Sequence, residues 1–148
     1  MEYFWLDAEM RLPRPDDLES INALLKRLSP NSPKLAMADI ERIARIESMS
    51  VVFARDTDDK DRIVGMARIV SVPMLVGREG VVEDVVVDQA CGGRGIGTQL
   101  MLNLLARART LGLVRVVLTT WPDREAANRL YSTLGFERLG INYYRLEL

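Results

Sequence analysis

A glycine-rich loop between two apolar stretches is the part of the sequence best suited to hold an anion. Residues 81–87 are rich in valine, which predicts a strand, and residues 92–97 hold four glycines in six positions. Apolar residues then recur at helical spacing as far as Gly112. A helix N-terminus after such a loop offers free backbone N–H groups and the positive end of its dipole. This order therefore predicts a phosphate-binding turn.

Two familiar phosphate-binding loops do not fit these residues. A Walker loop needs Gly-Lys-Ser/Thr after the spacer, but Gly95 is followed by Ile96 and Gly97. A dinucleotide-binding G-x-G-x-x-G that begins at Gly93 would need glycine at Thr98. On the glycines alone, the other interpretation is a tight strand-to-helix turn without a ligand.

A second group of residues with chemical potential lies at 124–136, about thirty residues after the loop. The spacing of Ala127, Leu130 and Leu134 predicts a helix that ends at Gly135. This helix carries Tyr131, whose phenol is protonated at pH 7 and can act as a general acid, because its unperturbed pKa is about 10. The other interpretation of Tyr131 is a half-buried packing residue.

Two adjacent carboxylates in the valine-rich strand are candidates for a general base. Glu83 and Asp84 are neighbours, so their side chains should leave opposite faces of the strand unless a bulge intervenes. The structural alternative is that one of them pairs with a basic side chain at the end of a sheet. The sequence does not decide which carboxylate, or water, accepts the proton.

Composition narrows the chemistry that these residues can perform. The 148 residues include no histidine and one cysteine, Cys91, which excludes histidine-dependent triads, an internal disulfide and a multi-thiolate metal site. We expect no metal, and we expect Cys91 to be an ordinary loop residue. The net charge of −1 gives no electrostatic reason to expect nucleic acid or a membrane surface as partner. No apolar run is as long as a membrane span, so the cytoplasm is the expected compartment.

Both motifs resemble those of the GNAT superfamily of acetyl-CoA-dependent N-acyltransferases. The family's first motif is a strand followed by Gln/Arg-x-x-Gly-x-Gly/Ala, and residues 92–97 occupy its place with Gly92 instead of Gln or Arg. The second motif is Asn-x-x-Ala-x-x-Leu-Tyr-x-x-x-Gly-Phe, and residues 124–136 match it except that Arg124 replaces the asparagine. Residues 83–87 are also similar to the matching strand of the glucosamine-phosphate acetyltransferases, in which the acidic pair belongs to the active site.

The resemblance implies a role for each candidate residue. Tyr131 would protonate the leaving sulfur, and Glu83 or Asp84 would handle the substrate. Backbone amides of the strand would meet the thioester and pantetheine, and the loop amides would cradle the pyrophosphate. We expect Arg124 to face a CoA phosphate or an acidic acceptor, with a solvated arginine as the alternative. The cofactor-binding candidates are Val85, Val86, Val87, Gly92, Gly93, Arg94, Gly95, Ile96, Gly97, Thr98 and Arg124.

The remaining sequence fits one domain over residues 1–148, of class α/β (α+β). The resemblance implies a mixed, partly parallel central sheet with helices on both faces. We expect strands at 2–12, 51–54, 63–72, 81–87, 114–119, 136–139 and 143–148. We expect helices at about 17–28, 35–46, 98–111 and 124–134, with an Asp16 or Asp17 cap on the first and an Asp123 cap on the last. The charged run 55–62 is interpreted as a solvated hairpin tip.

The predicted function is acetyl transfer from acetyl-CoA to a primary amine by direct attack in a ternary complex. The acceptor, a small molecule or a peptide, cannot be named from the sequence, although residues 28–38 and 73–79 are expected to shape its pocket. The family's frequent dimers make a homodimer an expectation to test. Two alternatives stay open: a catalytically weak acyl-CoA-binding sensor on the same fold, and a nucleotide-binding module that uses the glycine loop.

Overall fold

The computed structural model describes residues 1–6, 11–58 and 60–148. Its element order agrees with the predicted order from the first strand to the last helix. No helix of the described residues is both long and apolar enough to cross a membrane. The elements are β1 (Glu2–Trp5), α1 (Asp17–Leu28), α2 (Met37–Ala44), β2 (Met49–Asp56), β3 (Arg62–Pro73), β4 (Arg78–Val87), the 3-10 turn η1 (Gln89–Cys91), α3 (Ile96–Thr110), β5 (Arg115–Leu118) and α4 (Glu125–Thr133).

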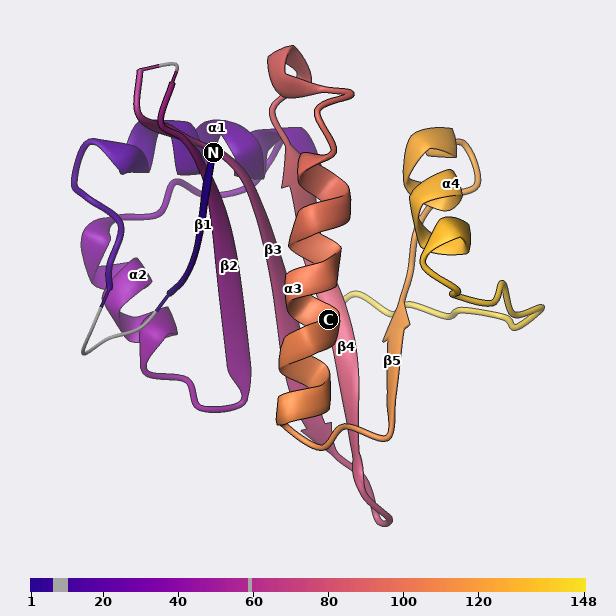
Figure 1. Ribbon diagram of the computed structural model, residues 1–148. Helices are drawn as coiled ribbons and strands as arrows, with labels where there is room; N and C mark the ends of the chain where they lie inside the picture. Colours follow the sequence, from indigo (N-terminus) through magenta and orange to yellow (C-terminus); the bar gives the residue numbers. More distant parts are fainter. Residues whose placement is uncertain (7–10, 59) are drawn as a thin grey trace.

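The strands form one sheet in the order β1-β2-β3-β4-β5 (Figure 1). The first four are joined by antiparallel pairing, whereas β4 and β5 are parallel. Helix α3 makes the crossover between these two strands, which parallel neighbours require. The prediction of a mixed, partly parallel sheet is confirmed.

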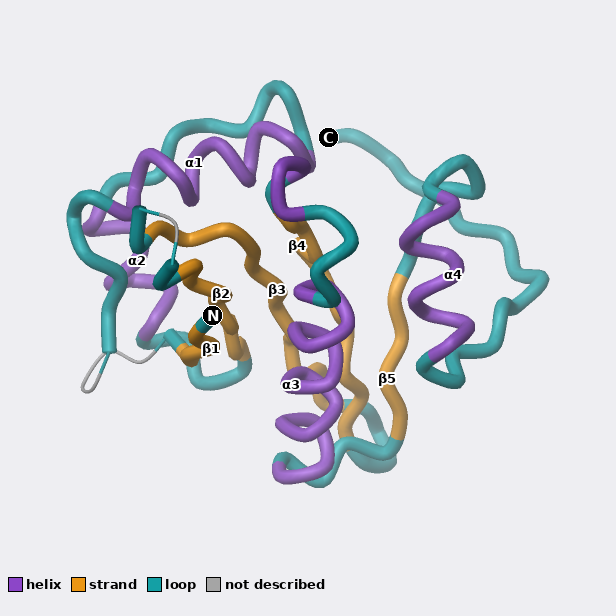
Figure 2. Tube along the Cα trace, turned by 45° about the horizontal axis from the view of Figure 1, so that its top comes forward, coloured by secondary structure: helices purple, strands orange, loops and turns teal. Residues whose placement is uncertain are grey.

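Alternating side chains of the strands build a core on each face of the sheet. On β2, Val52 and Ala54 join Leu100 and Leu104 of α3 in one buried cluster. Phe53, between them in sequence, belongs to the opposite cluster with residues of α1. Helices α1 and α3 therefore cover opposite faces, as predicted (Figure 2).

Strand β4 runs beside β5 over only part of its length. Residues Glu79–Val82 of β4 pair with Arg115–Leu118, and from Glu83 onward β4 pairs with β3 alone. The register between β3 and β4 also shifts here, because Ala67 faces two residues of β4. This β-bulge coincides with the end of the β4–β5 pairing. Within the described part of the chain, the backbone edge of β4 that faces β5 has no strand partner over 83–87.

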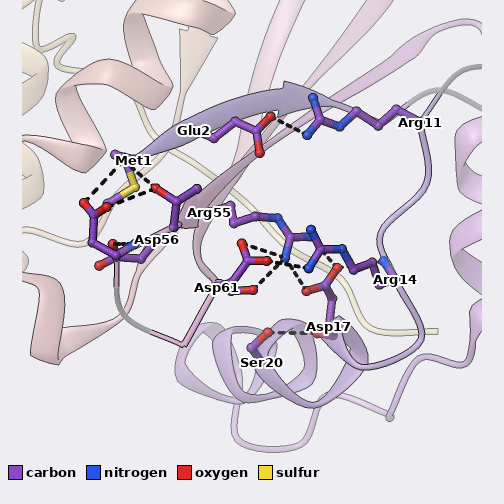
Figure 3. Close-up of polar contacts among 11 residues, drawn as sticks. Met1, Glu2, Arg11, Arg14, Asp17, Ser20, Arg55, Asp56 and Asp61 are labelled. Atoms are coloured by element: carbon purple, nitrogen blue, oxygen red, sulfur yellow. Dashed lines mark hydrogen bonds and ion pairs between the residues drawn. The ribbon is translucent and has the colours of Figure 1, made fainter.

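A buried ion pair ties α1 to the β2–β3 hairpin (Figure 3). Arg55 donates two hydrogen bonds to the Asp17 carboxylate, at 3.0 and 2.6 Å, and both side chains are almost fully buried. Asp61 at the hairpin tip pairs with Arg14 at 2.6 Å and accepts a further bond from Arg55 through its backbone carbonyl. The interpretation of 55–62 as a fully solvated tip is therefore wrong for its first residues.

Three other predictions need correction. The first strand ends at Trp5 instead of residue 12, and residues 7–10 lie outside the described part of the chain. No strand is found over 136–148 among the described residues, although both ends of this segment were predicted as strands. An alternating pattern marks residues that suit a strand, but a strand forms only where a partner supplies the ladder of hydrogen bonds.

Of the two predicted aspartate caps, the one on α1 is confirmed in position and the one on α4 is wrong. Arg124, not Asp123, occupies the N-cap position of α4. Asp16 is the N-cap residue of α1 but makes no side-chain cap bond. Asp17 instead accepts from the backbone N–H of Arg14 and from Arg55, because the buried guanidinium needs a carboxylate.

Candidate acyl-transfer site

The glycine loop places unpaired backbone donors at the start of α3. Gly93 and Gly95 have φ angles of 75° and 73°, the left-handed region that favours glycine, and space next to both Cα atoms is open. Gly95 is the N-cap residue of α3. Among the described residues, nothing accepts from the backbone N–H groups of Ile96, Gly97 and Thr98. The arrangement fits an anion such as a pyrophosphate.

Two ion pairs hold the loop in this shape. Asp88 accepts from Arg62 at 2.5 Å and from the Ala90 N–H at 3.0 Å, and the hydrogen bond from Arg62 is the main reason why the pKa of Asp88 is lowered. Arg94 pairs with the fully buried Asp56 of β2 and also lies near the Cys91 sulfur. The guanidinium of Arg94 is therefore engaged with the protein. The sequence reasoning missed Asp56, because it lies in a charged run that looks like solvated loop.

The candidate residues at the end of β4 lie beside the loop. Val86 is buried in the cluster under α1, whereas Val85 and Val87 pack against the cluster under α3. A Cβ added to Gly97 would lie 3.8 Å from Val87 and 3.5 Å from Leu130 of α4. The free edge of β4, the first turn of α3 and the middle of α4 are thus close together.

The bulge gives the two candidate carboxylates different surroundings. Glu83 is exposed and has no hydrogen-bond or ion-pair partner among the described residues. Directly opposite residues share a face, so Glu83 shares the α1 face with Arg68 of β3 and Val51 of β2. Asp84, in contrast, has its carboxylate 2.6 Å from Arg68 Nε. The sequence predicted that Glu83 and Asp84 leave opposite faces of the strand unless a bulge intervenes, and a bulge is present here.

Tyr131 lies on α4 and is half-buried against the α3-side cluster. Its ring meets Phe136 edge-on at 5.9 Å between centroids. Burial raises the pKa of the phenol, and the positive charge of Arg124 opposes that shift. No described residue is hydrogen-bonded to the Tyr131 hydroxyl. The phenol therefore stays protonated near neutral pH and has a proton to donate.

The segment before α4 is fixed by a residue that the motif comparison did not single out. Asn128 donates from its side chain to the carbonyl oxygens of Trp121 and Arg124, at 3.0 and 2.9 Å. Arg124 itself is exposed and has no side-chain partner among the described residues. Its charge is therefore available to an anionic ligand, whereas Asn128 holds the backbone. No helix-start pattern in the sequence marks Asn128, because its role depends on hydrogen bonds to carbonyl groups of the preceding loop.

Other features do not compete with this site. Cys91 is 3% exposed and lies in the α3-side core, which does not suit a nucleophile. No cluster of metal-binding side chains occurs in the part of the chain that is described. A shallow hollow on the outer side of α1 includes none of the predicted catalytic or cofactor-binding residues, although Lys34 belongs to the segment 28–38 that was expected to shape the acceptor pocket; it is lined by Glu19, Asn22, Ala23, Lys26 and Lys34.

Comparison with known proteins gives a consistent family assignment. The model of the acetyltransferase (GNAT) family matches residues 18–136. Glucosamine 6-phosphate N-acetyltransferase of Trypanosoma brucei brucei is 33% identical over an alignment of 150 positions that covers 97% of each protein. Glucosamine 6-phosphate N-acetyltransferase 1 of Oryza sativa subsp. japonica is 29% identical over 140 positions, which cover 88% of this chain and 83% of that protein.

The fold is also shared with solved structures. An aminoglycoside N-acetyltransferase in complex with CoA superimposes with a TM-score of 0.77 over 99% of this chain and 95% of that one. At 20% sequence identity, this similarity concerns the fold alone.

Proposed function

The chain belongs to the GNAT family of acetyltransferases and is an acetyl-CoA-dependent N-acyltransferase, and from this premise we propose that it acetylates the primary amine of a small acceptor by direct attack. One observation carries the proposal. The free edge of β4 lies close to the first turn of α3, which offers backbone donors, and this turn also contacts α4, which offers a protonated phenol. A thioester with a phosphorylated tail needs these groups in this order.

The loop and α3 would hold the CoA end of the substrate. The N–H groups of Ile96, Gly97 and Thr98 would donate to the pyrophosphate, and Arg124 would contribute charge from the start of α4. The pantetheine would lie along residues 85–87 and take up backbone hydrogen bonds that no strand fills. An N–H of the same stretch would stabilise the developing oxyanion.

The amine would approach from the α1 side of β4, where Glu83 lies. Its nitrogen forms the new amide bond with the acetyl carbonyl carbon, and the bond from that carbon to sulfur breaks. Glu83 takes the amine proton, directly or through one water, and Tyr131 protonates the departing sulfur. Solvent exchange then returns Tyr131 and Glu83 to their starting protonation states.

Direct attack is favoured over an acetylated enzyme by the surroundings of the cysteine. Cys91 is buried, and the sequence offers no histidine to activate it. Glucosamine 6-phosphate is the first acceptor to test, because two relatives are named for that reaction. Its phosphate would need a cation on the acceptor side; Arg68 shares the face of Glu83, but its Nε is already paired with Asp84.

The test is an acceptor panel with acetyl-CoA. Release of free CoA and formation of the acetylated product are followed with glucosamine 6-phosphate, glucosamine, a polyamine, an amino acid and no acceptor. We expect CoA release to depend on one amine and to match its product in amount. Equal CoA release with and without every amine would favour the acyl-CoA-binding sensor. Displacement of CoA by ATP or NAD at similar concentrations would favour the nucleotide-binding module.

A further inference from the structure

The adjacent carboxylates of β4 differ in backbone conformation. Asp84 has a φ angle of 55°, and within the described strands and helices it is the only non-glycine residue in the left-handed region. That region is strained for most side chains, but Asp and Asn enter it several times more often than others. Glu83 has no such conformation. The left-handed residue is therefore a feature of this one position.

The left-handed residue is the first residue of the bulge. Arg68 faces Glu83 and Met66 faces Val86, so that Asp84 and Val85 together oppose Ala67. In one type of β-bulge this first position is usually glycine in the left-handed conformation. Asp84 takes the place of that glycine.

The bulge changes which face each later side chain occupies. Val82 belongs to the α3-side cluster and Val86 to the α1-side cluster, although residues four apart on a regular strand share a face. Val85 and Val87 consequently turn to the α3 side. The pairing with β5 ends at Val82, just before the bulge. The free edge needed for the thioester thus begins where Asp84 bends the strand.

Arg68 is placed to hold this conformation. Its Nε lies 2.6 Å from an Asp84 carboxylate oxygen, which makes an ion pair, although the geometry is not that of a hydrogen bond; the two side chains are 28% and 37% exposed. The partner of Asp84 thus comes from the strand across the bulge, and the pair bridges the irregular part of the ladder. Glu83, one residue away, has no partner among the described residues.

We propose that Asp84 is a positioning residue, whose left-handed backbone and ion pair with Arg68 set the bulge, and that Glu83 alone is the carboxylate presented to the acceptor amine. The proposal rests on the proposed function only for the role of Glu83. The role of Asp84 follows from the backbone conformation, the register and the ion pair. A base must reach the proton that it removes, and the Asp84 carboxylate is already held by Arg68.

A matched series at Asp84 separates backbone shape from carboxylate chemistry. Asp84→Gly and Asp84→Asn accept a positive φ angle but lack the carboxylate, whereas Asp84→Ala lacks both. We expect the Gly and Asn variants to keep turnover within about tenfold of the parent, and the Ala variant to be slower than both. Glu83→Gln should lower turnover by about 10²–10⁴-fold and keep its affinity for CoA.

The pH dependence of turnover gives a second test, because substitution of a residue with a purely structural role does not remove a limb of the pH profile. We expect the acidic limb to persist in Asp84→Asn and to disappear in Glu83→Gln. If Asp84→Asn and Asp84→Gly fall as far as Glu83→Gln and lose the limb, Asp84 is the base and the proposal is wrong. Equal turnover of the Gly, Asn and Ala variants would contradict a role for the left-handed conformation.

Two measurements do not depend on turnover, so they test the positioning role of Asp84 separately from the proposed function. CoA affinity by calorimetry and the urea midpoint of unfolding should both be higher for Asp84→Gly than for Asp84→Ala, since only alanine is strained at this φ angle. If the parent acetylates no amine, the proposed function fails, yet this order still tests the positioning role. The reverse order would overturn that role even in an active enzyme.

Discussion

At the scale of single residues, the chemistry depends on how the surroundings adjust one phenol. Burial raises the pKa of Tyr131, and Arg124 partly opposes this effect. A general acid must be protonated, so the basic limb of the pH profile should lie above the ordinary pKa of tyrosine, about 10. Arg124 therefore has two separable effects: it attracts anions, and it makes the phenol more acidic.

Tyr131→Phe tests this assignment, because it keeps the ring against Phe136 and removes only the hydroxyl. Turnover should fall about 10²–10⁴-fold with little change in CoA affinity, and the basic limb should disappear. Arg124→Ala should move that limb to still higher pH, because it removes the charge that lowers the pKa of the phenol. Parent turnover in the phenylalanine variant would reduce Tyr131 to a packing residue.

Arg94 is a site residue that we expect to act through the protein and not through the ligand. It pairs with the buried Asp56, so its substitution should weaken CoA binding by loosening the loop. Arg94→Gln, Asp56→Asn and the double variant form a cycle that is measured by calorimetry with CoA. The double variant should bind CoA no more weakly than the worse single variant. Fully additive losses would indicate that Arg94 contacts CoA itself.

Residue chemistry was easier to predict than residue partnership. The types and spacing of Glu83, Tyr131 and the loop glycines are visible in the sequence. The partner of Asp84 is Arg68 on the neighbouring strand, 16 positions away, and the partner of Arg94 in the loop is Asp56 at the end of β2, 38 positions away. Nothing in a local pattern marks such pairs, because strand register brings the first together and the packing of the loop against the end of β2 brings the second together.

At the scale of elements, two glycines at the start of α3 differ in what their positions require: one has a backbone conformation that favours glycine, and the other lies within the helix itself. Gly95 has a φ angle of 73°, whereas Gly97 lies in the first turn of α3, where an added Cβ would make ordinary contacts. Gly95→Val should therefore weaken CoA binding more than tenfold, about 1.4 kcal/mol, through strain and through obstruction of the loop. Gly97→Ala is the control, and it should bind CoA within a few-fold of the parent. Equal affinities for the parent and a folded Gly95→Val variant would remove the loop from the site.

The elements themselves followed from periodicity wherever they bury one face. Helix α1 and strand β3 begin and end within one or two residues of their predicted limits, because apolar residues at regular spacing define a buried side. The segment 136–148 has a similar alternation, but its apolar side chains after Phe136, such as Ile141 and Leu146, are exposed. A pattern cannot reveal whether a partner strand is present.

At the scale of the whole molecule, the buried pair of Asp17 and Arg55 connects the start of α1 to the end of β2 (Figure 3). Helix α1 covers the face of the sheet on which we propose that the acceptor binds. Asp17→Asn would remove the hydrogen-bonded countercharge of the buried Arg55 and leave it with the partly exposed Asp61 carboxylate, 3.8 Å away. It should lower the free energy of unfolding by about 3–5 kcal/mol, measured by urea denaturation. Asp61→Asn is the control: its side chain is 45% exposed, so the loss should be much smaller than that of Asp17→Asn. Equal losses in the two variants would contradict the importance of burial.

Direct transfer from acetyl-CoA to an amine is the central claim for the whole enzyme, and a single-turnover experiment tests it most directly. Enzyme in excess is mixed with acetyl-CoA labelled in the acetyl group, with and without the acceptor found in the panel. The label is then followed in product, protein and acetate. We predict that it moves to the product only when acceptor is present and that it never resides on the protein. Label on the protein, for example at Cys91, or acetate formed at the same rate without acceptor, would contradict direct transfer.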